Sequence, residues 1–576
     1  MILSILKARF ATALDGYVDD FHQYLDLIRP SQDPKFGDFQ ANLAMPLARK
    51  LGKKPRDAAT EIVHRLEIDD ICEKPEIAGP GFINLRLKSD FLVELLKKAV
   101  LDSDRLAVAP VAETDRKTIV LDYSGPNVAK PMHVGHLRST VIGSALYRML
   151  KFQGHHVISD NHLGDWGTQF GMIIYGYRNF LDPEEYKKNP VEELSRVYRQ
   201  VRQEVDKPNE AVAVAVLAET AKLHEGDEEN LKIWRDVLPH SMDEIDRIYN
   251  RLNISFDYVL GESFYQPMLA GVVQECLDEG VAVETDGAVG IFFEGDDVPM
   301  LIRKKDGAFL YGTTDLATMK YRKKEFDPDE ILILTDFRQS LHFEHLFKAT
   351  RMLGIGDVEL KHIKFGTVLG EDGKPFKTRS GDTVGLNGLL DEAEHRALEI
   401  VKANERGNLS ESEQKDVSRR IGIGAIVYAD LSQNRESDYV FSYDKMLAMN
   451  GNTATYMQYA VARVRSIFSR GEIDGETVRK QTDKLALTEP AERALALELL
   501  KFGEAIEFAL RDYRPNLLTT YLFELANRYS TFFEQCPVLK AEDDAVKTSR
   551  LLLCDLTART LGKGLELLGI ETVERM

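Results

Sequence analysis

Lys130, His133 and His136 lie close together in one segment of the chain, with Gly135 between the two histidines. Imidazole and ammonium groups donate hydrogen bonds to phosphate oxygens, and each well-placed donor to a transition-state oxyanion is worth roughly 3 kcal/mol. Gly135 has no Cβ, so a flat ligand such as a purine ring can approach the backbone there. These residues favour transfer of an adenylyl group, with three positive groups beside the phosphate.

The neighbouring residues place this segment between a strand and a helix. Residues 117–123 form a β-branched and apolar run, and apolar residues recur at helical spacing over 141–150. The start of such a helix offers unpaired backbone N–H groups and the positive end of the helix dipole, which stabilise a phosphate. The loop is therefore predicted to bind a nucleotide. The alternative is that each histidine only caps the helix or packs at its surface.

A second basic segment lies far downstream. Asp372-Gly373 is a strong hairpin-turn pair, and a cluster of polar and basic residues follows it between Pro375 and Gly381. The cluster consists of Lys377, Thr378, Arg379 and Ser380. It predicts a basic, glycine-hinged loop.

Together these segments resemble class I aminoacyl-tRNA synthetases and, more narrowly, arginyl-tRNA synthetases. Besides the HVGH motif (residues 133–136), the matching motifs are residues 124–140, 161–171, 310–318, 455–460 and 567–576. The resemblance covers nearly the whole chain. It implies an α/β fold: a Rossmann-like catalytic domain with insertions, an N-terminal α+β domain and a C-terminal all-α helix bundle that binds the anticodon. It also implies activation of L-arginine by ATP with Mg²⁺ and transfer to the 3′ end of tRNA(Arg), with no structural metal.

The same resemblance assigns roles to individual residues. The implied catalytic residues are Lys130, His133, His136, Lys377 and Arg379, and the implied ATP-binding residues are Gly135, His133, His136, Thr378 and Ser380. The implied arginine-binding residues are Asp122, Ser124, Asn127, Tyr311, Asp315 and Gln339, and the implied tRNA-binding residues are Tyr456, Gln458, Tyr459, Arg463 and Met576. One departure is that the usual Lys-Met-Ser-Lys-Ser loop keeps neither lysine in register, so Lys130 is expected to supply part of the missing charge.

Selection of arginine requires a carboxylate, because a planar bidentate acceptor distinguishes guanidinium from ammonium. Asp315 is the best candidate, and Tyr311 precedes it by one helical turn. The alternative for Asp315 is a structural role as the N-cap of a helix over 316–324. The aromatic residues and methionine among the tRNA candidates likewise have an alternative role in packing the helix bundle.

The pattern along the chain predicts three domains. Residues 1–112 form an α+β unit with a helix at its start, a strand at 81–87 and a helix at 91–101, and by resemblance this unit contacts the outer corner of tRNA. Residues 113–385 form the catalytic domain, with further strands at 155–160 and 330–335. Its insertions are a polar helical segment at about 181–250 and a strand-like one at about 265–310. Residues 386–576 form the helical domain, with a capping box at Ser410.

Composition narrows the choice of function and location. The 576 residues carry a net charge of −19, so an RNA partner requires a local basic patch. Cys72, Cys276, Cys536 and Cys554 are isolated, which disfavours a zinc ribbon or a disulfide framework. No apolar run approaches the ~20 residues of a membrane helix. The cytoplasm is the expected location, and the family resemblance implies a monomer.

Two rival functions remain open at this point. A small-molecule nucleotidyltransferase can share the HVGH motif but has no use for a large helical domain. An inactive paralogue that binds RNA or regulates another protein is expected to have lost charged groups such as Lys130, His133 and Asp315, which are present here.

Overall fold

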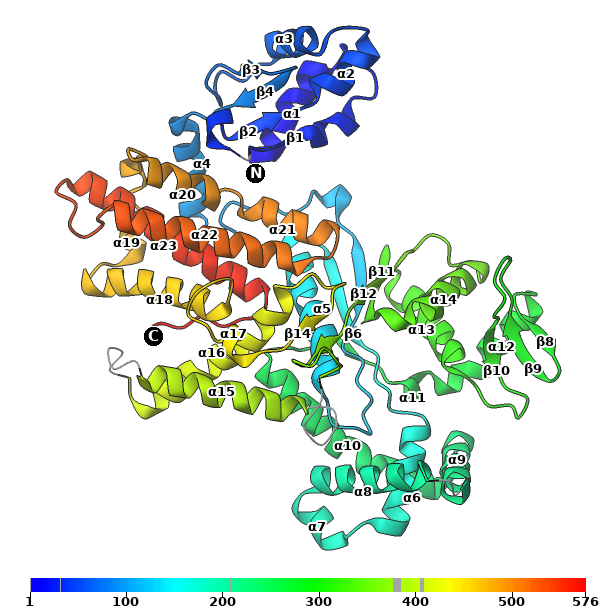
Figure 1. Cartoon of the computed structure of the whole chain (residues 1–576). Coiled ribbons are helices and arrows are strands. Elements are labelled where there is room, and N and C mark those ends of the chain that lie inside the picture. Colours follow the sequence, from blue (N-terminus) through cyan, green and yellow to red (C-terminus); the bar gives the residue numbers. More distant parts are fainter. Residues whose placement is uncertain (1, 32, 208–209, 377–384, 404–408) are drawn as a thin grey trace.

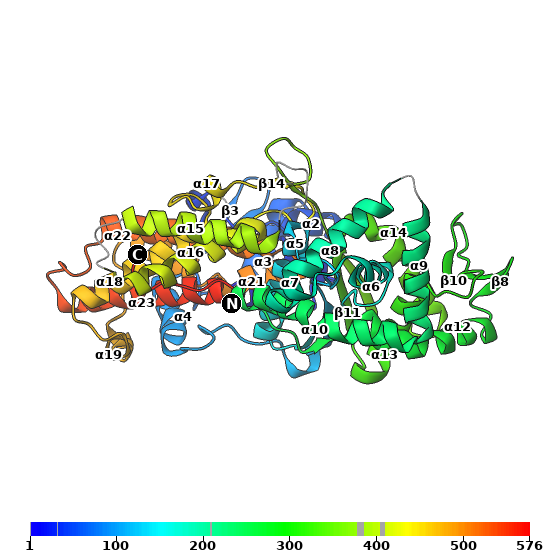
Figure 2. The same ribbon diagram turned by 90° about the horizontal axis from the view of Figure 1, so that it is seen from below.

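The computed structural model of the chain describes residues 2–31, 33–207, 210–376, 385–403 and 409–576. An N-terminal unit, a central parallel sheet with two insertions and a C-terminal helical region follow one another along the chain (Figure 1). Seen from below, the C-terminal helices and the second insertion lie at opposite ends of an elongated molecule (Figure 2). The predicted fold class is confirmed, and the predicted domain boundaries stay predictions.

The N-terminal unit combines helices with an antiparallel sheet in the order β1-β2-β4-β3. Its elements are α1 (Ile2–Leu14), β1 (Ile28–Pro30), β2 (Phe39–Ala41), α2 (Ala44–Leu51), α3 (Pro55–Arg65), β3 (Glu76–Ala78), β4 (Phe82–Leu85) and α4 (Ser89–Leu101). The predicted first helix, strand and closing helix are confirmed as α1, β4 and α4. Asp38 joins this unit to the C-terminal region through a bidentate ion pair with Arg493, at 2.7 and 2.8 Å.

The central sheet is parallel throughout, in the order β12-β11-β5-β6-β7. Its strands are β5 (Thr118–Asp122), β6 (His156–Asn161), β7 (Tyr258–Val259), β11 (Glu330–Asp336) and β12 (Glu359–Phe365). The three strands predicted from the sequence are confirmed as β5, β6 and β11. The chain continues from β5 to β6 on one side and places β11 on the other, so the strand order reverses at β5, and sheets of this kind bind ligands beyond the carboxyl ends of their strands.

Both faces of this sheet are covered, which explains the continuous apolar run of β11. Leu332 and Leu334 pack in the core that contains α5 (Val134–Gln153), whereas Ile331 and Ile333 pack with α13 (Tyr311–Phe326) and α14 (Ser340–Met352). Successive strand residues face opposite sides of a sheet, so a strand buried on both faces has no polar alternation.

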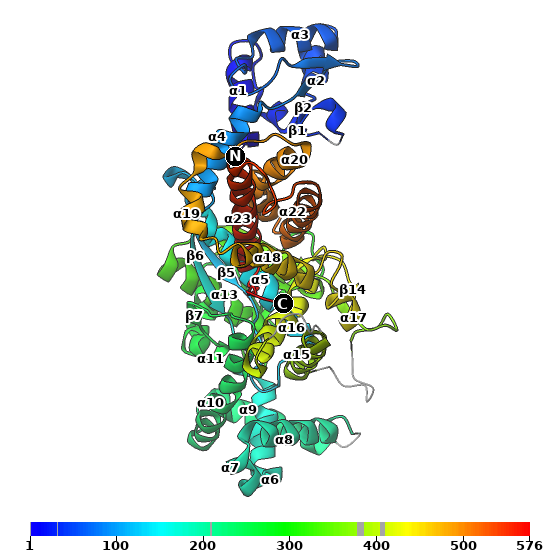
Figure 3. The same ribbon diagram turned by 90° about the vertical axis from the view of Figure 1, so that its left-hand side faces the viewer.

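Both insertions protrude from the catalytic region (Figure 1), and Figure 3 shows the helices of the first from another side. The first is helical, as predicted, and the helices of this part of the chain are α6 (Thr168–Phe180), α7 (Pro183–Lys188), α8 (Pro190–Val205), α9 (Glu210–Glu225) and α10 (Glu228–Arg251). The second holds α11 (Glu262–Tyr265), α12 (Leu269–Asp278) and an antiparallel sheet of β8 (Val283–Thr285), β9 (Ala288–Ile291) and β10 (Met300–Arg303). Helix α12 was not predicted, although its buried Leu269, Val272, Val273 and Cys276 have helical spacing.

The C-terminal region is a helix bundle, as predicted. Its main helices are α15 (Leu386–Ala403), α16 (Glu411–Leu431), α18 (Ala454–Arg470), α20 (Pro490–Leu499), α21 (Phe502–Arg511), α22 (Pro515–Gln535) and α23 (Asp544–Leu567). Ser410 and Glu413 form the predicted capping box of α16. A small parallel pair, β13 (Val368–Leu369) and β14 (Tyr439–Val440), connects this region to the catalytic one.

All four cysteines are free and buried. Within the described ranges, no helix is long and apolar enough to cross a membrane.

Candidate active site

His133 is the N-cap of α5, and both histidine rings close the first turn of that helix. Nδ1 of His133 accepts a hydrogen bond from the Gly135 N–H (3.0 Å), and Nδ1 of His136 accepts one from the His133 N–H (3.1 Å). A neutral imidazole that accepts at Nδ1 carries its proton on Nε2. The histidines do cap the helix, but each ring keeps an Nε2–H donor, so capping does not exclude the predicted role toward phosphate. The ring centroids are only 4.0 Å apart, so the two donors form one group.

These histidines differ from the sequence prediction in their charge. Burial, followed by the charge of Lys130, lowers the pKa of His133. Burial, His133 and Lys130 together lower the pKa of His136 to about 3. The site therefore contains two neutral donors and one cation at neutral pH. The Lys130 ammonium lies 5.5 Å from the ring centroid of Tyr198 in α8, and it forms no ion pair with any residue that the structure describes.

The basic loop falls at the edge of what the structure describes. Lys377, Thr378, Arg379 and Ser380 lie outside the described residues, so their predicted roles stay predictions. Of the flanking residues, Gly385 forms an antiparallel bridge with His133, and the Leu386 N–H donates to the Met132 carbonyl (2.9 Å). One end of this segment is thus fixed beside the HVGH motif.

Asp315 lies inside α13, whose N-cap is Leu310, so the alternative that Asp315 is itself an N-cap is wrong. Tyr311 and Asp315 are one turn apart on this helix, as predicted. Asp315 Oδ2 lies 2.5 Å from Nε2 of His342 in α14, and the Tyr311 side chain is 62% exposed. The hydrogen bond to Asp315 raises the pKa of His342. The carboxylate is therefore held in place from one side.

Glu262, which the sequence reasoning missed, adds a second carboxylate near Asp315. Burial and the neighbouring carboxylates of Asp315 and Asp165 raise the pKa of Glu262 to about 8. No cation within the described part of the chain forms an ion pair with it. Glu262 follows β7 at the carboxyl end of the sheet, where ligands bind. The sequence signal was the short apolar run 258–260 followed by Gly261, which is too brief to identify as a strand.

Asp122 ends β5 and is engaged with a buried guanidinium that the sequence reasoning also missed. Arg322 is 1% exposed, and its Nη2 lies 2.6 Å from Asp122 Oδ2 and 2.8 Å from Asp160 Oδ2. Two carboxylates against one guanidinium leave one negative charge. The predicted role of Asp122 toward an ammonium group is thus limited to its other oxygen and to this residual charge.

The remaining predicted arginine contacts all lie near the same edge of the sheet. Ser124 has a left-handed φ of 75°, and its hydroxyl is bonded to the hydroxyls of Thr140 (2.7 Å) and Tyr249 (2.8 Å), so this hydroxyl is occupied within the protein. Asn127 Oδ1 accepts from the Ala129 N–H (3.2 Å), which leaves the Asn127 amide group as a donor. Gln339 ends the short 3-10 helix after β11 and is exposed.

The predicted tRNA contacts on α18 divide into two groups. Gln458 is fully buried, and its amide donates to the carbonyls of Arg420 (3.1 Å) and Glu571 (2.8 Å), so the prediction that Gln458 contacts RNA is wrong in this conformation. Tyr456, Tyr459 and Arg463 follow one another at helical spacing, and Tyr459 is 38% exposed. The Arg463 guanidinium stacks 4.1 Å from the ring centroid of Phe533. Met576 is half-buried against the core.

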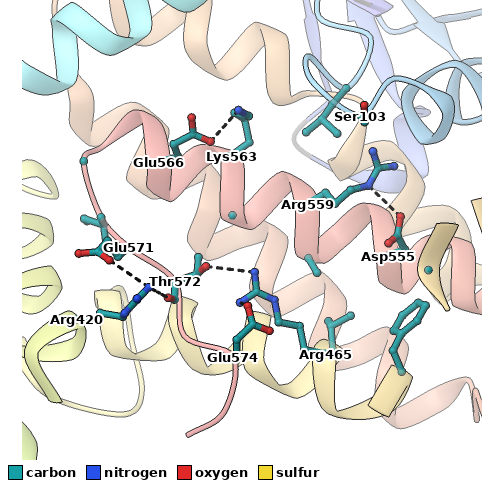
Figure 4. A pocket seen from close by; sticks show the side chains of 18 of the residues that line it. Ser103, Arg420, Arg465, Asp555, Arg559, Lys563, Glu566, Glu571, Thr572 and Glu574 are labelled. Carbon is teal, nitrogen blue, oxygen red and sulfur yellow. Dashed lines mark hydrogen bonds and ion pairs between the residues drawn. The ribbon is translucent and has the colours of Figure 1, made fainter. Parts of the chain in front are cut away.

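A cavity of about 730 Å³ lies in the C-terminal region, between α18, α23 and the chain end (Figure 4). None of the predicted site residues lines it. Its charged side chains pair with one another, in the pairs Arg559–Asp555, Lys563–Glu566, Arg465–Glu574 and Arg420–Glu571, at 2.8–3.1 Å. Arg420 and Arg465 also donate to the Thr572 carbonyl (3.2 Å) and the Val573 carbonyl (3.0 Å). The contacts of Arg420 and Arg465 therefore hold the chain end in place, whereas the other two pairs lie within α23.

Comparison with known proteins agrees with this geometry in every region of the chain. Residues 97–443 match the family model of the class I tRNA synthetase (R) catalytic domain, residues 457–576 match the DALR anticodon binding domain, and residues 4–87 match the arginyl tRNA synthetase N-terminal domain. A parallel sheet with paired imidazoles at the start of α5 is thus the catalytic core of a class I tRNA synthetase.

Individual relatives narrow the class. The chain is 46% identical to an arginine–tRNA ligase of Rhodopirellula baltica, over 100% of this chain and 99% of that one. The chain is similar in structure to arginyl-tRNA synthetases of Plasmodium falciparum (29% identity, TM-score 0.84, 100% of this chain and 99% of that one) and Thermus thermophilus (25% identity, TM-score 0.83, 100% of both chains). The chain belongs to the arginyl-tRNA synthetase family.

Proposed function

We propose that this protein activates L-arginine with ATP and transfers the arginyl group to the 3′ end of tRNA(Arg). One observation carries the proposal beyond family membership. Two neutral imidazole donors and a cation lie at the start of α5. The carboxyl groups of Glu262 and Asp315 lie at the same carboxyl edge of the sheet, without enough neighbouring cations to balance two carboxylates. The first group suits a phosphate, and the second suits a guanidinium.

ATP binds over the HVGH motif. Its α-phosphate lies at the N-terminus of α5, where the helix dipole and the Nε2–H donors of His133 and His136 stabilise negative charge. The adenine lies near Gly135, where a Cβ would come within 2.8 Å of the His133 ring, so a glycine leaves that ring room to close on the start of the helix. Mg²⁺ enters with the phosphates of ATP, as it does where substrate oxygens supply most of its ligands. Thr378 and Ser380 are predicted to complete the nucleotide site.

Arginine binds across the edge of the sheet. Its guanidinium pairs with Asp315 and Glu262, next to the Tyr311 hydroxyl, because planar N–H groups fit carboxylates bidentately. Its ammonium group faces the remaining oxygen of Asp122 and the backbone at Ser124, with Asn127 and Gln339 beside it. The two positive groups of the substrate thus meet two separate acidic sites.

The reaction needs no protein nucleophile. A carboxylate oxygen of arginine attacks the α-phosphorus of ATP in line, and the bond to pyrophosphate breaks. A hydroxyl of the terminal ribose of tRNA then attacks the acyl carbon, and AMP leaves. Lys130 and the two imidazoles stabilise the charge that develops on the α-phosphate, with Lys377 and Arg379 predicted to assist, so catalysis rests on positioning and electrostatics.

Transfer RNA binds along the helical region. Tyr459, which is exposed on α18, contacts the anticodon arm together with Tyr456, Arg463 and Met576, while the N-terminal unit contacts the outer corner. Because the whole chain is strongly acidic, binding depends on local basic contacts and weakens steeply with salt. We also propose that the protein acts as a monomer in the cytoplasm.

The decisive experiment is ATP–pyrophosphate exchange with each amino acid in turn, with and without bulk tRNA. We expect exchange with arginine only. Stimulation by another amino acid would reassign the specificity, and an absence of exchange under all conditions would favour the inactive paralogue.

A further inference from the structure

Three buried polar side chains connect α5 to the helical region. Arg138 lies two residues after His136, and its Nε is 3.2 Å from Asp430 Oδ2 near the end of α16. The Tyr439 hydroxyl at the start of β14 donates to the same Asp430 oxygen (3.0 Å), and Arg138 Nη1 donates to the Ser437 carbonyl (2.9 Å). Arg138 and Asp430 are each 1% exposed. Helices α5 and α16 pack side by side at the centre of the molecule (Figure 1).

This cluster is a poor device for stability alone. Removing two charges from water is expensive, and well-packed apolar residues in place of a buried ion pair are often as stable or more so. Its hydrogen bonding is also incomplete, because Arg138 Nη2 and Asp430 Oδ1 have no hydrogen-bond partner among the described residues. An unsatisfied buried group calls for another explanation. The geometry offers one explanation: the cluster fixes the position of α5 relative to α16 and β14.

On one side, the cluster fixes the helix that carries both catalytic imidazoles. Arg138 is less than a turn from His136 on the same helix, and its guanidinium also lies 5.2 Å from the ring centroid of Tyr439 and 6.0 Å from that of Phe365. An α-helix is stiff over this length. The direction in which His133 and His136 present their Nε2–H groups is therefore set where Arg138 is held.

On the other side, the cluster fixes the segment that leads to the basic loop. Tyr439 pairs with Val368 of β13, and the Phe376 N–H donates to the Val368 carbonyl (3.1 Å). The Phe376 ring stacks on Phe441 with centroids 4.8 Å apart. Phe376 is the last described residue before Lys377. One chain of contacts thus runs from His136 through Arg138 and Tyr439 to Phe376.

We propose that Arg138, Asp430 and Tyr439 form a positioning cluster that sets the HVGH imidazoles relative to the entry of the basic loop. The inference rests on the proposed function. The cluster touches neither the nucleotide nor arginine, so it governs the rate of adenylate formation rather than the affinity for either substrate. Misplacement of catalytic groups by about 1 Å costs roughly 100-fold in rate.

The test is ATP–pyrophosphate exchange with arginine, measured together with thermal unfolding. Tyr439→Phe removes one hydroxyl from a packed ring, and we expect kcat to fall roughly 3- to 10-fold while the KM values for ATP and arginine stay within twofold. The double variant Arg138→Met with Asp430→Leu removes both charges at similar volume. We expect it to keep the wild-type Tm and to lose roughly 10- to 100-fold in kcat.

A matched control is another buried pair outside the active site, Arg550 and Glu492, whose Nε and Oε1 are 2.8 Å apart between α23 and α20. Arg550→Met with Glu492→Leu should leave kcat unchanged. Wild-type kcat in both Tyr439→Phe and the Arg138 and Asp430 double variant would overturn the inference, because a stability role alone would then suffice. Failure of the proposed function is distinguishable, since the wild-type protein itself would then show no exchange with arginine.

Discussion

The catalytic edge of the sheet and the C-terminal cavity contain similar side chains in opposite electrostatic conditions. At the edge, the pKa of His136 falls to about 3, the pKa of Glu262 rises to about 8, and Lys130 has no carboxylate partner in the described structure. At the cavity, the basic and acidic side chains form ion pairs with one another. Charge left unbalanced at the catalytic edge indicates where ligands supply the missing partners.

Polar residues thus have two uses in this chain: to bind ligands at the catalytic edge and to stabilise the fold at the cavity. In the C-terminal cavity, the ion pairs hold the chain end or lie within α23. Ionisation of the whole acidic group around Asp315 is costly, because the carboxyl groups of Glu262, Asp315 and Asp165 lie close together in a partly buried site. A bound guanidinium would relieve that cost, and the proposed binding of arginine draws on it. The following predictions test the contrast from its largest effect to its smallest.

Asp315→Asn should have the largest effect. Truncation of one partner in a buried charge pair costs about 2–5 kcal/mol, so kcat/KM for arginine should fall at least ~30-fold. Asparagine keeps the size of the side chain and a hydrogen-bonding group for His342. Pyrophosphate exchange across a range of arginine concentrations measures the loss. Glu325→Gln, an exposed acid on the same helix, is the control, and an Asp315→Asn enzyme with unchanged kcat/KM would place the guanidinium elsewhere.

The affinity for arginine should rise with pH. The pKa of Glu262 is raised to about 8 in the free protein, and a bound guanidinium favours the ionised form. The contribution of Glu262 is therefore fully present above pH 8 and is lost as pH falls, by up to about tenfold per unit. Calorimetry at fixed ionic strength, between about pH 6.5 and 9, measures this slope, because that range spans the titration of Glu262. Glu262→Gln should flatten the profile, and an equally steep profile in that variant would assign the titration to another group.

Lys130→Ala should reduce adenylate formation by roughly tenfold or more with little change in ATP affinity, because the ammonium group acts mainly on charge that develops in the transition state. Single-turnover adenylation and equilibrium binding of ATP separate the two quantities. Lys348→Ala removes a lysine that is already paired with Asp296 (2.7 Å) and serves as the control. Unchanged turnover in Lys130→Ala would make Lys130 a bystander.

Lys563→Ala, at the cavity, should have the smallest effect. Lys563 pairs with Glu566 one helical turn away, an interaction worth under ~0.5 kcal/mol. Denaturant unfolding should show a shift of that size, and exchange activity should equal that of the wild type. A large loss of activity would mean that the cavity is a functional site. Charged side chains that pair within the protein could then no longer be assigned a purely structural role.

Local sequence was sufficient where neighbouring residues define the structure. The apolar runs predicted β5, β6 and β11, Ser410 predicted its capping box, and the motif around His133 predicted a strand, loop and helix. It failed where the element was short or where one pattern fits two structures. β7 has only two residues. The residues of α12 have helical spacing, but they lie in an insertion whose pattern as a whole predicts strands. Gln458 was assigned to RNA because its motif is on a helix whose inward face only the packed bundle defines.

The sequence by itself determined the residue types at the site and the family, because motifs and hydrophobic spacing are properties of the chain in order. The tertiary structure decided the charge state of the histidines, the pairing of Asp122 with Arg322 and the meeting of Glu262 with Asp315. These depend on burial and on neighbours distant in sequence, since desolvation and Coulomb forces act through space rather than along the chain.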